Sequence, residues 1–262
     1  MKYHFKEVVN GQYTVEIDLK TCLSSSQLDT LESNLKSMAN EDDFFTITGT
    51  KRLFSLKNGI LTYRSETILP LVNRRNKEKV LMVFGNPATI SINHGMFYFS
   101  NKNFARHTMW SKLQEAGLIG SVNHDNKDMP LYKRRKLEAD ERRKLILNGS
   151  SSDKYLLGLT TFYSFPTPVT GKYANVAGVK KLFGPILSKI NEMEINRILS
   201  YPFSKNATLV FVQKSTHDVF EHLAPAKIKE IKRYIYWPAV SRKKDVSKRG
   251  VDLAVMLERV CG

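Results

Sequence analysis

The chain has 262 residues, 42% of them hydrophobic and 25% charged, a composition that allows one sizeable core and excludes a largely disordered protein. No run approaches the roughly eighteen apolar residues of a membrane span, and the first ten residues carry no apolar signal-peptide core, so we expect a cytoplasmic protein with no membrane partner. With only Cys22 and Cys261, the chain offers no disulfide framework, no structural zinc site and no iron–sulfur cluster.

The charge is the most informative bulk property. Lys and Arg number 41 against 25 Asp and Glu, which gives a formal net charge of +16. Such an excess attracts polyanions and favours DNA or RNA as a partner, although solubility alone would also account for a basic chain.

Residues 1–75 have the pattern of a mixed α and β extension. Residues 13–17 alternate like a short strand, and residues 26–38 have helical spacing after a serine-rich start. A hairpin is predicted over 54–63, because Asn58-Gly59 is a strong turn signal. We expect this extension to pack on a core domain formed by residues 76–262.

The core domain alternates between apolar strands and amphipathic helices. Strands are predicted over 80–84, 155–159, 208–212 and 234–236, and helices over 108–118, over 179–198, from 216 and over 252–260. This order predicts an α/β fold, a three-layer αβα arrangement with a short central sheet of four mostly parallel strands. Ligands of such sheets bind beyond the carboxyl ends of the strands, so the loops after these four strands are where chemistry is expected.

A hydrophilic insertion over residues 121–154 interrupts the alternation. It carries two basic clusters, at 133–136 and 142–144, with the acidic residues Glu138, Asp140 and Glu141 between them. The pattern fits a DNA-contacting insertion and a solvated helix equally well.

The loop after the first strand carries the most distinctive motif. Residues 84–88 read Phe-Gly-Asn-Pro-Ala, and an Asn-His-Gly-Met-Phe-Tyr-Phe stretch at 93–99 leads to a helix that ends in Ala-Gly-Leu. This resembles the first signature region of the uracil-DNA glycosylase superfamily, in the manner of its mismatch-specific uracil/thymine branch. Residues 158–167, 208–220 and 236–242 resemble, in the same order, the superfamily's second strand and loop, its strand-to-helix turn and its second signature loop.

The resemblance implies a monofunctional DNA glycosylase. Such an enzyme flips a pyrimidine out of DNA and hydrolyses its glycosidic bond, leaving an abasic site; here we expect it to act as a monomer without a metal or other cofactor. By the resemblance, Asn86 is the catalytic residue that orients the attacking water, and Tyr98 or Phe99 stacks on the flipped base. The implied base pocket comprises Phe84, Gly85, Pro87, His94, Tyr98, Phe99, Thr160 and Trp237.

The implied DNA contacts lie directly after two of the predicted strands, those at 208–212 and 234–236. In the superfamily the second signature loop enters the minor groove, so Arg242 is expected to act as a wedge while its basic neighbours bind phosphates. The implied DNA-binding residues are Lys214, Ser215, Ser241, Arg242, Lys243 and Lys244.

Three departures from the superfamily pattern bear on specificity. Phe84 and Gln213 replace glycines, and Trp237 replaces the histidine or asparagine of the second signature. A remodelled pocket would suit a damaged or modified pyrimidine, including the bulky modified cytosines of viral DNA, which would make the enzyme an antiviral defence. Lost signature residues also fit a catalytically silent DNA-binding relative. A third possibility, a basic α/β protein that binds RNA or nucleotides, predicts a phosphate loop, and no such motif occurs.

The dipeptide His217-Asp218 has the composition of an acid–base pair. Adjacent residues on a helix point in different directions, so we interpret the pair as structural, with Thr216 and Asp218 as helix caps.

Overall fold

A computed structural model describes residues 2–9, 11–41, 53–100, 102–224, 231–238 and 249–261 of the chain. The chain forms two compact units. Unit 1 comprises Met1–Thr67, Gly85–Phe97 and Thr161–Asn196, and unit 2 comprises Ile68–Phe84, Tyr98–Thr160 and Arg197–Gly262. Each unit is therefore assembled from three separate stretches of the sequence.

Unit 1 contains an antiparallel sheet with the strand order β1-β2-β4-β3. Its strands are β1 (Tyr3–Val9), β2 (Gln12–Asp18), β3 (Phe54–Lys57) and β4 (Ile60–Glu66). In β2 the side chains of Val15 and Ile17 are buried while Glu16 between them is exposed, so one face of the sheet is covered. The predicted strand at 13–17 is confirmed, whereas β1 was not anticipated.

The hairpin predicted around Asn58-Gly59 is also confirmed. The backbone angle φ is 51° at Asn58 and 70° at Gly59, and Lys57 pairs with Ile60 across the turn. Two successive positive φ values are the signature of a type I′ turn, whose twist matches that of the strands it joins.

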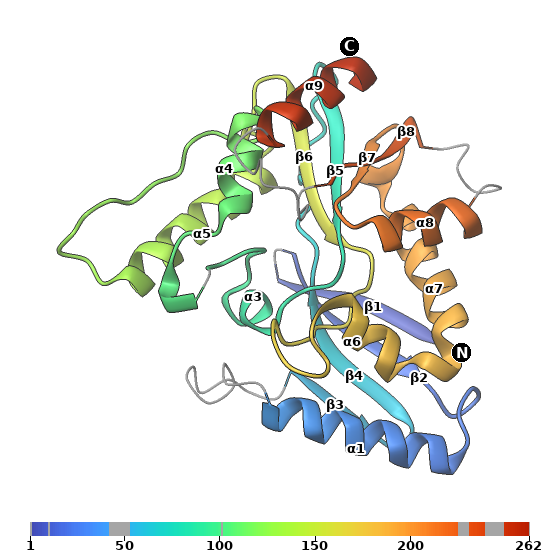
Figure 1. The fold of residues 1–262 in the computed structure, drawn as a ribbon. Helices are drawn as coiled ribbons and strands as arrows, with labels where there is room; N and C mark the ends of the chain where they lie inside the picture. Colours follow the sequence, from blue (N-terminus) through green and yellow to red (C-terminus); the bar gives the residue numbers. More distant parts are fainter. Residues whose placement is uncertain are drawn as a thin grey trace. The chain divides into compact units, whose positions relative to one another are not determined.

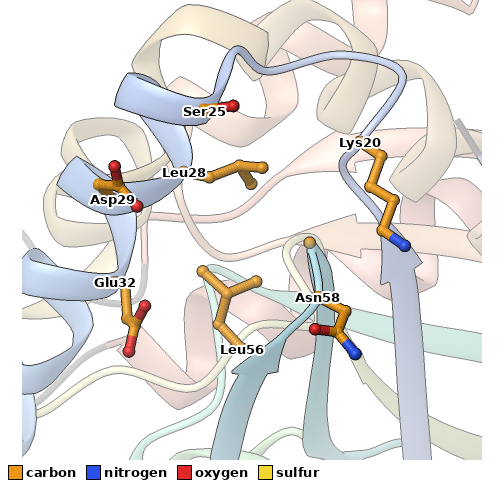
Figure 2. Close-up of a pocket in the computed structure, with 8 residues that line it drawn as sticks. Lys20, Ser25, Leu28, Asp29, Glu32, Leu56 and Asn58 are labelled. Carbon is orange, nitrogen blue, oxygen red and sulfur yellow. The ribbon is translucent and has the colours of Figure 1, made fainter.

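Helix α1 (Ser25–Glu41) contains the helix predicted at 26–38. Its start is a capping box, because the Ser24 hydroxyl accepts from the Gln27 backbone nitrogen at 3.3 Å and the Gln27 side chain accepts from the Ser24 nitrogen at 2.9 Å. Leu31, Leu35 and Met38 lie on its buried face. Figure 2 shows the pocket of about 330 Å³ between this helix and the hairpin turn; it is lined by Lys20, Ser25, Leu28, Asp29, Glu32, Leu56, Asn58 and Gly59.

The single helix predicted over 179–198 is wrong, since the chain breaks there into separate helices. They are α6 (Asn175–Leu182), the short 3-10 helix η2 (Gly184–Ile186) and α7 (Leu187–Ser200). Pro185 explains the break, because proline has no backbone N–H and disfavours helical geometry at the residue before it. Unit 1 also contains the short helix α3 (Thr89–His94).

Unit 2 is built on a four-stranded parallel sheet with the order β6-β5-β7-β8. Its strands are β5 (Glu78–Phe84), β6 (Tyr155–Thr161), β7 (Thr208–Phe211) and β8 (Arg233–Tyr236), which confirms the four predicted strands. Every side chain of β6 and β7 is buried, as expected for strands covered on both faces. Gly158 is needed within β6, because a Cβ atom there would lie 2.8 Å from the Phe203 ring.

Helices cover both faces of this sheet, which gives the predicted three-layer αβα arrangement (Figure 1). The helices of unit 2 are α4 (Thr108–Glu115), α5 (Leu131–Leu147), α8 (Lys214–Leu223) and α9 (Arg249–Cys261), with the 3-10 turns η1 (Lys102–Phe104) and η3 (Pro202–Ser204). Helices α4 and α9 pack together, and α8 packs on β7 and β8. Among the described helices, none is long and apolar enough to cross a lipid bilayer.

The basic insertion forms α5, and part of its charge is internal. Glu138 is fully buried and accepts from Arg135 Nη1 and from Arg106 Nη2, both at 2.6 Å, while Arg142 Nη2 lies 3.4 Å away. Burial by itself raises the pKa of Glu138, but the hydrogen bond from Arg106 and the neighbouring cations outweigh it and lower the pKa. Arg135 and Arg142 are buried, so they hold the insertion together and are not free to contact DNA in this conformation.

Candidate active site

The loops that follow β5 and β6 are joined by main-chain hydrogen bonds. Tyr163 N donates to Gly85 O at 2.9 Å, Thr167 N donates to Pro87 O at 3.1 Å, and Thr89 N donates to Thr167 O at 3.2 Å. These residues all belong to unit 1. The two loops therefore form one framework around Asn86, although their sequences are about eighty positions apart.

The side-chain amide of Asn86 is held in a single orientation. Its Nδ2 atom donates to the Thr167 hydroxyl at 2.7 Å and to the Pro87 carbonyl at 3.1 Å. A carbonyl oxygen can only accept, so the nitrogen of the amide must face Pro87 and its oxygen must face the other way. No described residue donates to Asn86 Oδ1, and the side chain is half-buried. This oxygen is therefore an oriented acceptor for a group that no described residue provides.

In unit 2, Tyr98 is held from two sides. Its ring and the Phe84 ring form a T-shaped pair with a centroid distance of 4.9 Å, and the His107 ring lies at 4.5 Å. The Tyr98 backbone has the uncommon φ of 48°, and its carbonyl accepts from Trp110 Nε1 at 3.0 Å. The residue as a whole is half-buried. An aromatic ring fixed in this way can serve as a platform for stacking.

His107, which the predicted site did not include, supports Tyr98 and begins α4. Its Nδ1 accepts from Met109 N at 3.1 Å, so the imidazole is the N-cap of the helix. Burial, with a smaller contribution from Lys112, lowers the pKa of His107 to about 4. The ring is therefore neutral near pH 7, as an accepting Nδ1 requires. Histidine is not among the preferred N-cap residues, so this role could not be predicted from the local sequence.

Three other predicted pocket residues have different surroundings. Phe99 and Thr160 are buried, and Thr160 Oγ1 accepts from Arg197 Nη1 at 3.2 Å. His94 is half-buried and ends α3, just before Gly95 in the left-handed conformation. Their roles in holding a base stay predictions.

Trp237 follows β8 directly and is almost completely buried, with 1% of its surface exposed. Its backbone nitrogen donates to Phe211 O at 2.8 Å, which places it beside the end of β7. The indole N–H and the side-chain oxygen of Gln213 are both buried, and neither has a hydrogen-bond partner in the described part of the chain. An unsatisfied buried polar group costs about 1–3 kcal/mol. A donor and an acceptor at neighbouring strand ends therefore suggest a ligand that accepts from the Trp237 indole and donates to the Gln213 oxygen.

The structure places only part of the predicted DNA-binding set. Lys214 and Ser215 are exposed at the start of α8, and Lys214 Nζ is paired with both carboxylate oxygens of Asp218 at 3.0 Å. The other four residues, Ser241, Arg242, Lys243 and Lys244, lie outside the described residues.

No model of a known protein family and no curated protein matches this chain. The resemblance to the uracil-DNA glycosylase superfamily is therefore one of ordered sequence motifs alone.

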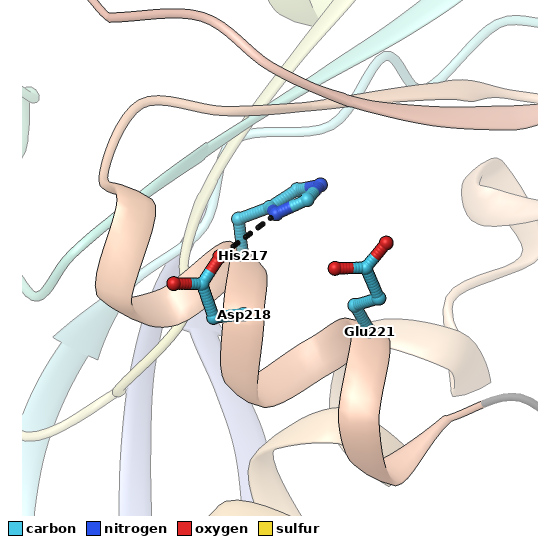
Figure 3. A group of neighbouring side chains, drawn as sticks. All are labelled: His217, Asp218 and Glu221. Carbon is cyan, nitrogen blue, oxygen red and sulfur yellow. Dashed lines mark hydrogen bonds and ion pairs between the residues drawn. The ribbon is translucent and has the colours of Figure 1, made fainter.

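A second cluster lies on α8, where His217, Asp218 and Glu221 offer ligand atoms within 4.8 Å of one another (Figure 3). His217 Nδ1 and Asp218 Oδ1 are 3.4 Å apart, so the two side chains do not point apart as expected. The predicted caps are also wrong, because the helix begins at Lys214 with Gln213 as its N-cap. Asp218 and Glu221 are exposed, and Lys214 already neutralises Asp218, so the cluster is explained as a surface charge network.

Proposed function

We propose that this chain is a DNA glycosylase of the uracil-DNA glycosylase superfamily that excises a damaged or modified pyrimidine. The observation that carries the proposal is the held amide of Asn86, whose nitrogen is fixed by Thr167 and Pro87 while its oxygen remains available as an acceptor. The motif order, the parallel sheet and the net charge of +16 support the same function.

The reaction needs a positioned water more than a strong base. As the bond between C1′ of the sugar and N1 of the base breaks, its electron pair leaves with the base and the sugar becomes an oxocarbenium-like cation. Water adds its oxygen to C1′ and releases a proton to solvent, which leaves an abasic site. Because this cation is highly electrophilic, a water that donates a hydrogen bond to Asn86 Oδ1 needs orientation and little activation.

We assign recognition of the base to Tyr98 and Trp237. The ring of the half-buried residue Tyr98 is suited to stacking on a flipped base, which contributes about 1–3 kcal/mol. The indole N–H of Trp237 would donate to a base carbonyl, where the superfamily uses histidine. A bulkier residue implies a reshaped pocket, which supports a modified pyrimidine as substrate, such as a modified cytosine of viral DNA. We also propose a cytoplasmic location, in keeping with the two unpaired cysteines.

The test compares DNA duplexes that carry different pyrimidine modifications and scores alkali-labile abasic sites. We expect excision of at least one modified base, and a loss of about 100-fold or more in Asn86→Ala with unchanged DNA binding. Asn123→Ala, the same substitution at an exposed position, is the matched control and should keep full activity.

Two results would contradict the proposal. Full activity in Asn86→Ala would remove Asn86 from the mechanism. DNA binding without excision of any base would identify a catalytically silent DNA-binding relative instead.

A further inference from the structure

A basic groove lies at the amino ends of the strands of unit 2. It has a volume of about 440 Å³ and is lined by Asn73, Arg74, Arg75, Lys77, Glu78, Lys79, Asn206 and Lys232. These residues precede or begin β5, β7 and β8, which are neighbours in the parallel sheet. The amino-end groove is therefore at the opposite edge of the sheet from Gln213 and Trp237.

Most of the positive charge in the groove has no partner of opposite sign within the described ranges of the chain. Glu78 is the only acidic residue among the described residues of the lining, and Lys232 Nζ pairs with it at 2.7 Å. Lys77 Nζ donates to the Gly149 carbonyl at 3.1 Å, which fixes the ammonium group without neutralising it. Arg74 and Arg75 are exposed, and no carboxylate among the described residues pairs with either of them. An anion in the groove would meet four cations that form no ion pair with a described residue: Arg74, Arg75, Lys77 and Lys79.

The lining indicates which kind of anion fits. None of the residues that line the groove is aromatic or aliphatic, so its described walls offer neither a stacking surface nor an apolar contact for a base. Guanidinium and ammonium groups beside two asparagines are the donors that proteins use for phosphate oxygens. Lys154 and Lys205, which precede β6 and β7, add positive charge at the same edge, and Asp153 precedes Lys154 in the chain.

We propose that the amino-end groove binds the phosphodiester backbone of nucleic acid without sequence preference. The molecule then has a second nucleic-acid contact in addition to the one proposed at the carboxyl ends of the strands. This inference depends on the charge and lining of the groove and needs no base excision.

The experiment measures the affinity for an unmodified DNA duplex as a function of salt, in the Asn86→Ala background so that excision has no influence. Each phosphate contact contributes about 0.9 to the slope of log K against log salt, so Arg74→Gln/Arg75→Gln should reduce the slope by about 2. The control Lys6→Gln/Lys57→Gln removes the same charge from exposed positions of unit 1 and should leave the slope nearly unchanged. Equal slopes for the two double variants would overturn the proposal.

A second measurement does not depend on charge. Arg74→p-benzoylphenylalanine should form a photo-induced adduct with bound DNA, whereas Lys57→p-benzoylphenylalanine should not. The proposal would be wrong if excess inorganic pyrophosphate prevented the adduct but an excess of long competitor DNA did not. The groove would then be a site for a small phosphate ligand. Since both side chains are exposed, folding is expected to be retained, and the thermal melting of each variant checks this.

Discussion

The hydroxyl of Thr167 lies 2.7 Å from the amide nitrogen of Asn86, although the two residues are 81 positions apart in the chain. This bond joins the loop after β5 to the loop after β6. Since the Thr167 hydroxyl must accept from Asn86, its own proton is directed to the carbonyl of Pro168 or Asn175, each 3.4 Å away. Thr167 is thus a positioning residue for the proposed catalytic amide.

Replacing Thr167 with valine keeps the shape of the side chain but removes the acceptor. We expect excision to fall by about 10-fold or more because the Asn86 amide can then rotate, while DNA affinity stays the same. Thr167→Ser retains the hydroxyl and should restore most of the activity. The measurement is single-turnover excision of the preferred base. Equal loss in the valine and serine variants would mean that Thr167 acts through loop stability and not through the hydroxyl.

Trp237→Phe removes a hydrogen-bond donor that has no partner in the described part of the protein. We expect the free energy of unfolding to fall by no more than about 2 kcal/mol, while excision falls by about 10-fold if the N–H contacts the base. Trp110→Phe is the matched control for stability, because it leaves the Tyr98 carbonyl without its donor and should cost more. Trp237→His should raise activity on plain uracil and lower it on the preferred base. Unchanged excision in Trp237→Phe would exclude this contact.

Glu138→Gln should strongly destabilise unit 2. The substitution removes the negative charge that the buried Arg135 and Arg142 share, and leaving buried cations without an anionic partner costs about 3–5 kcal/mol. Glu141→Gln is the control, since Glu141 is paired with His124 at the surface and should contribute less than about 1 kcal/mol. Urea unfolding at neutral pH measures both. Similar values for the two variants would show that Glu138 is not required as an anion.

The low pKa of His107 predicts an acid-sensitive fold. Its pKa is about 4 in the folded protein and 6.5 in the unfolded chain, so below pH 6.5 only the unfolded state readily binds the proton. The free energy of unfolding should therefore fall between pH 6.5 and 4 by at most about 3 kcal/mol, with no contribution from this residue above 6.5. His107→Asn keeps a capping acceptor that does not titrate, so the difference between the two proteins should follow this pH range. If the free energies of unfolding of the two proteins changed with pH in parallel, the low pKa of His107 would be contradicted.

Much of the fold followed from local sequence signals. The apolar run of β5 and the turn at Asn58-Gly59 each reflect forces within a few residues, and both were predicted correctly. Strand β1 was missed because Lys6 and Glu7 interrupt its apolar pattern, and its pairing with β2 is what makes it a strand. The break at Pro185 could have been predicted, since the proline itself causes it.

The candidate site was less accessible to prediction. The position of Asn86 after a buried strand follows from the sequence, but its contact with Thr167 depends on how two distant loops meet. The basic insertion remained undecided for a similar reason, because only the tertiary structure brings Arg106 to Glu138 and shows which arginines are internal. Local patterns report which residues are present, whereas the orientation of polar side chains is set by partners far away in the chain.

The three main-chain bonds that join the loops after β5 and β6 have a consequence for changing what the protein acts on. Peptide groups are common to every amino acid except for the missing N–H of proline, so these three bonds do not themselves require particular side chains at the positions they join. Position 88, which is only half-buried, is therefore a place where a new side chain could be presented on a constant scaffold, whereas Ser164 and Phe165 are buried and contribute to packing. Natural variation could have used the same freedom to exchange one target for another without a new fold.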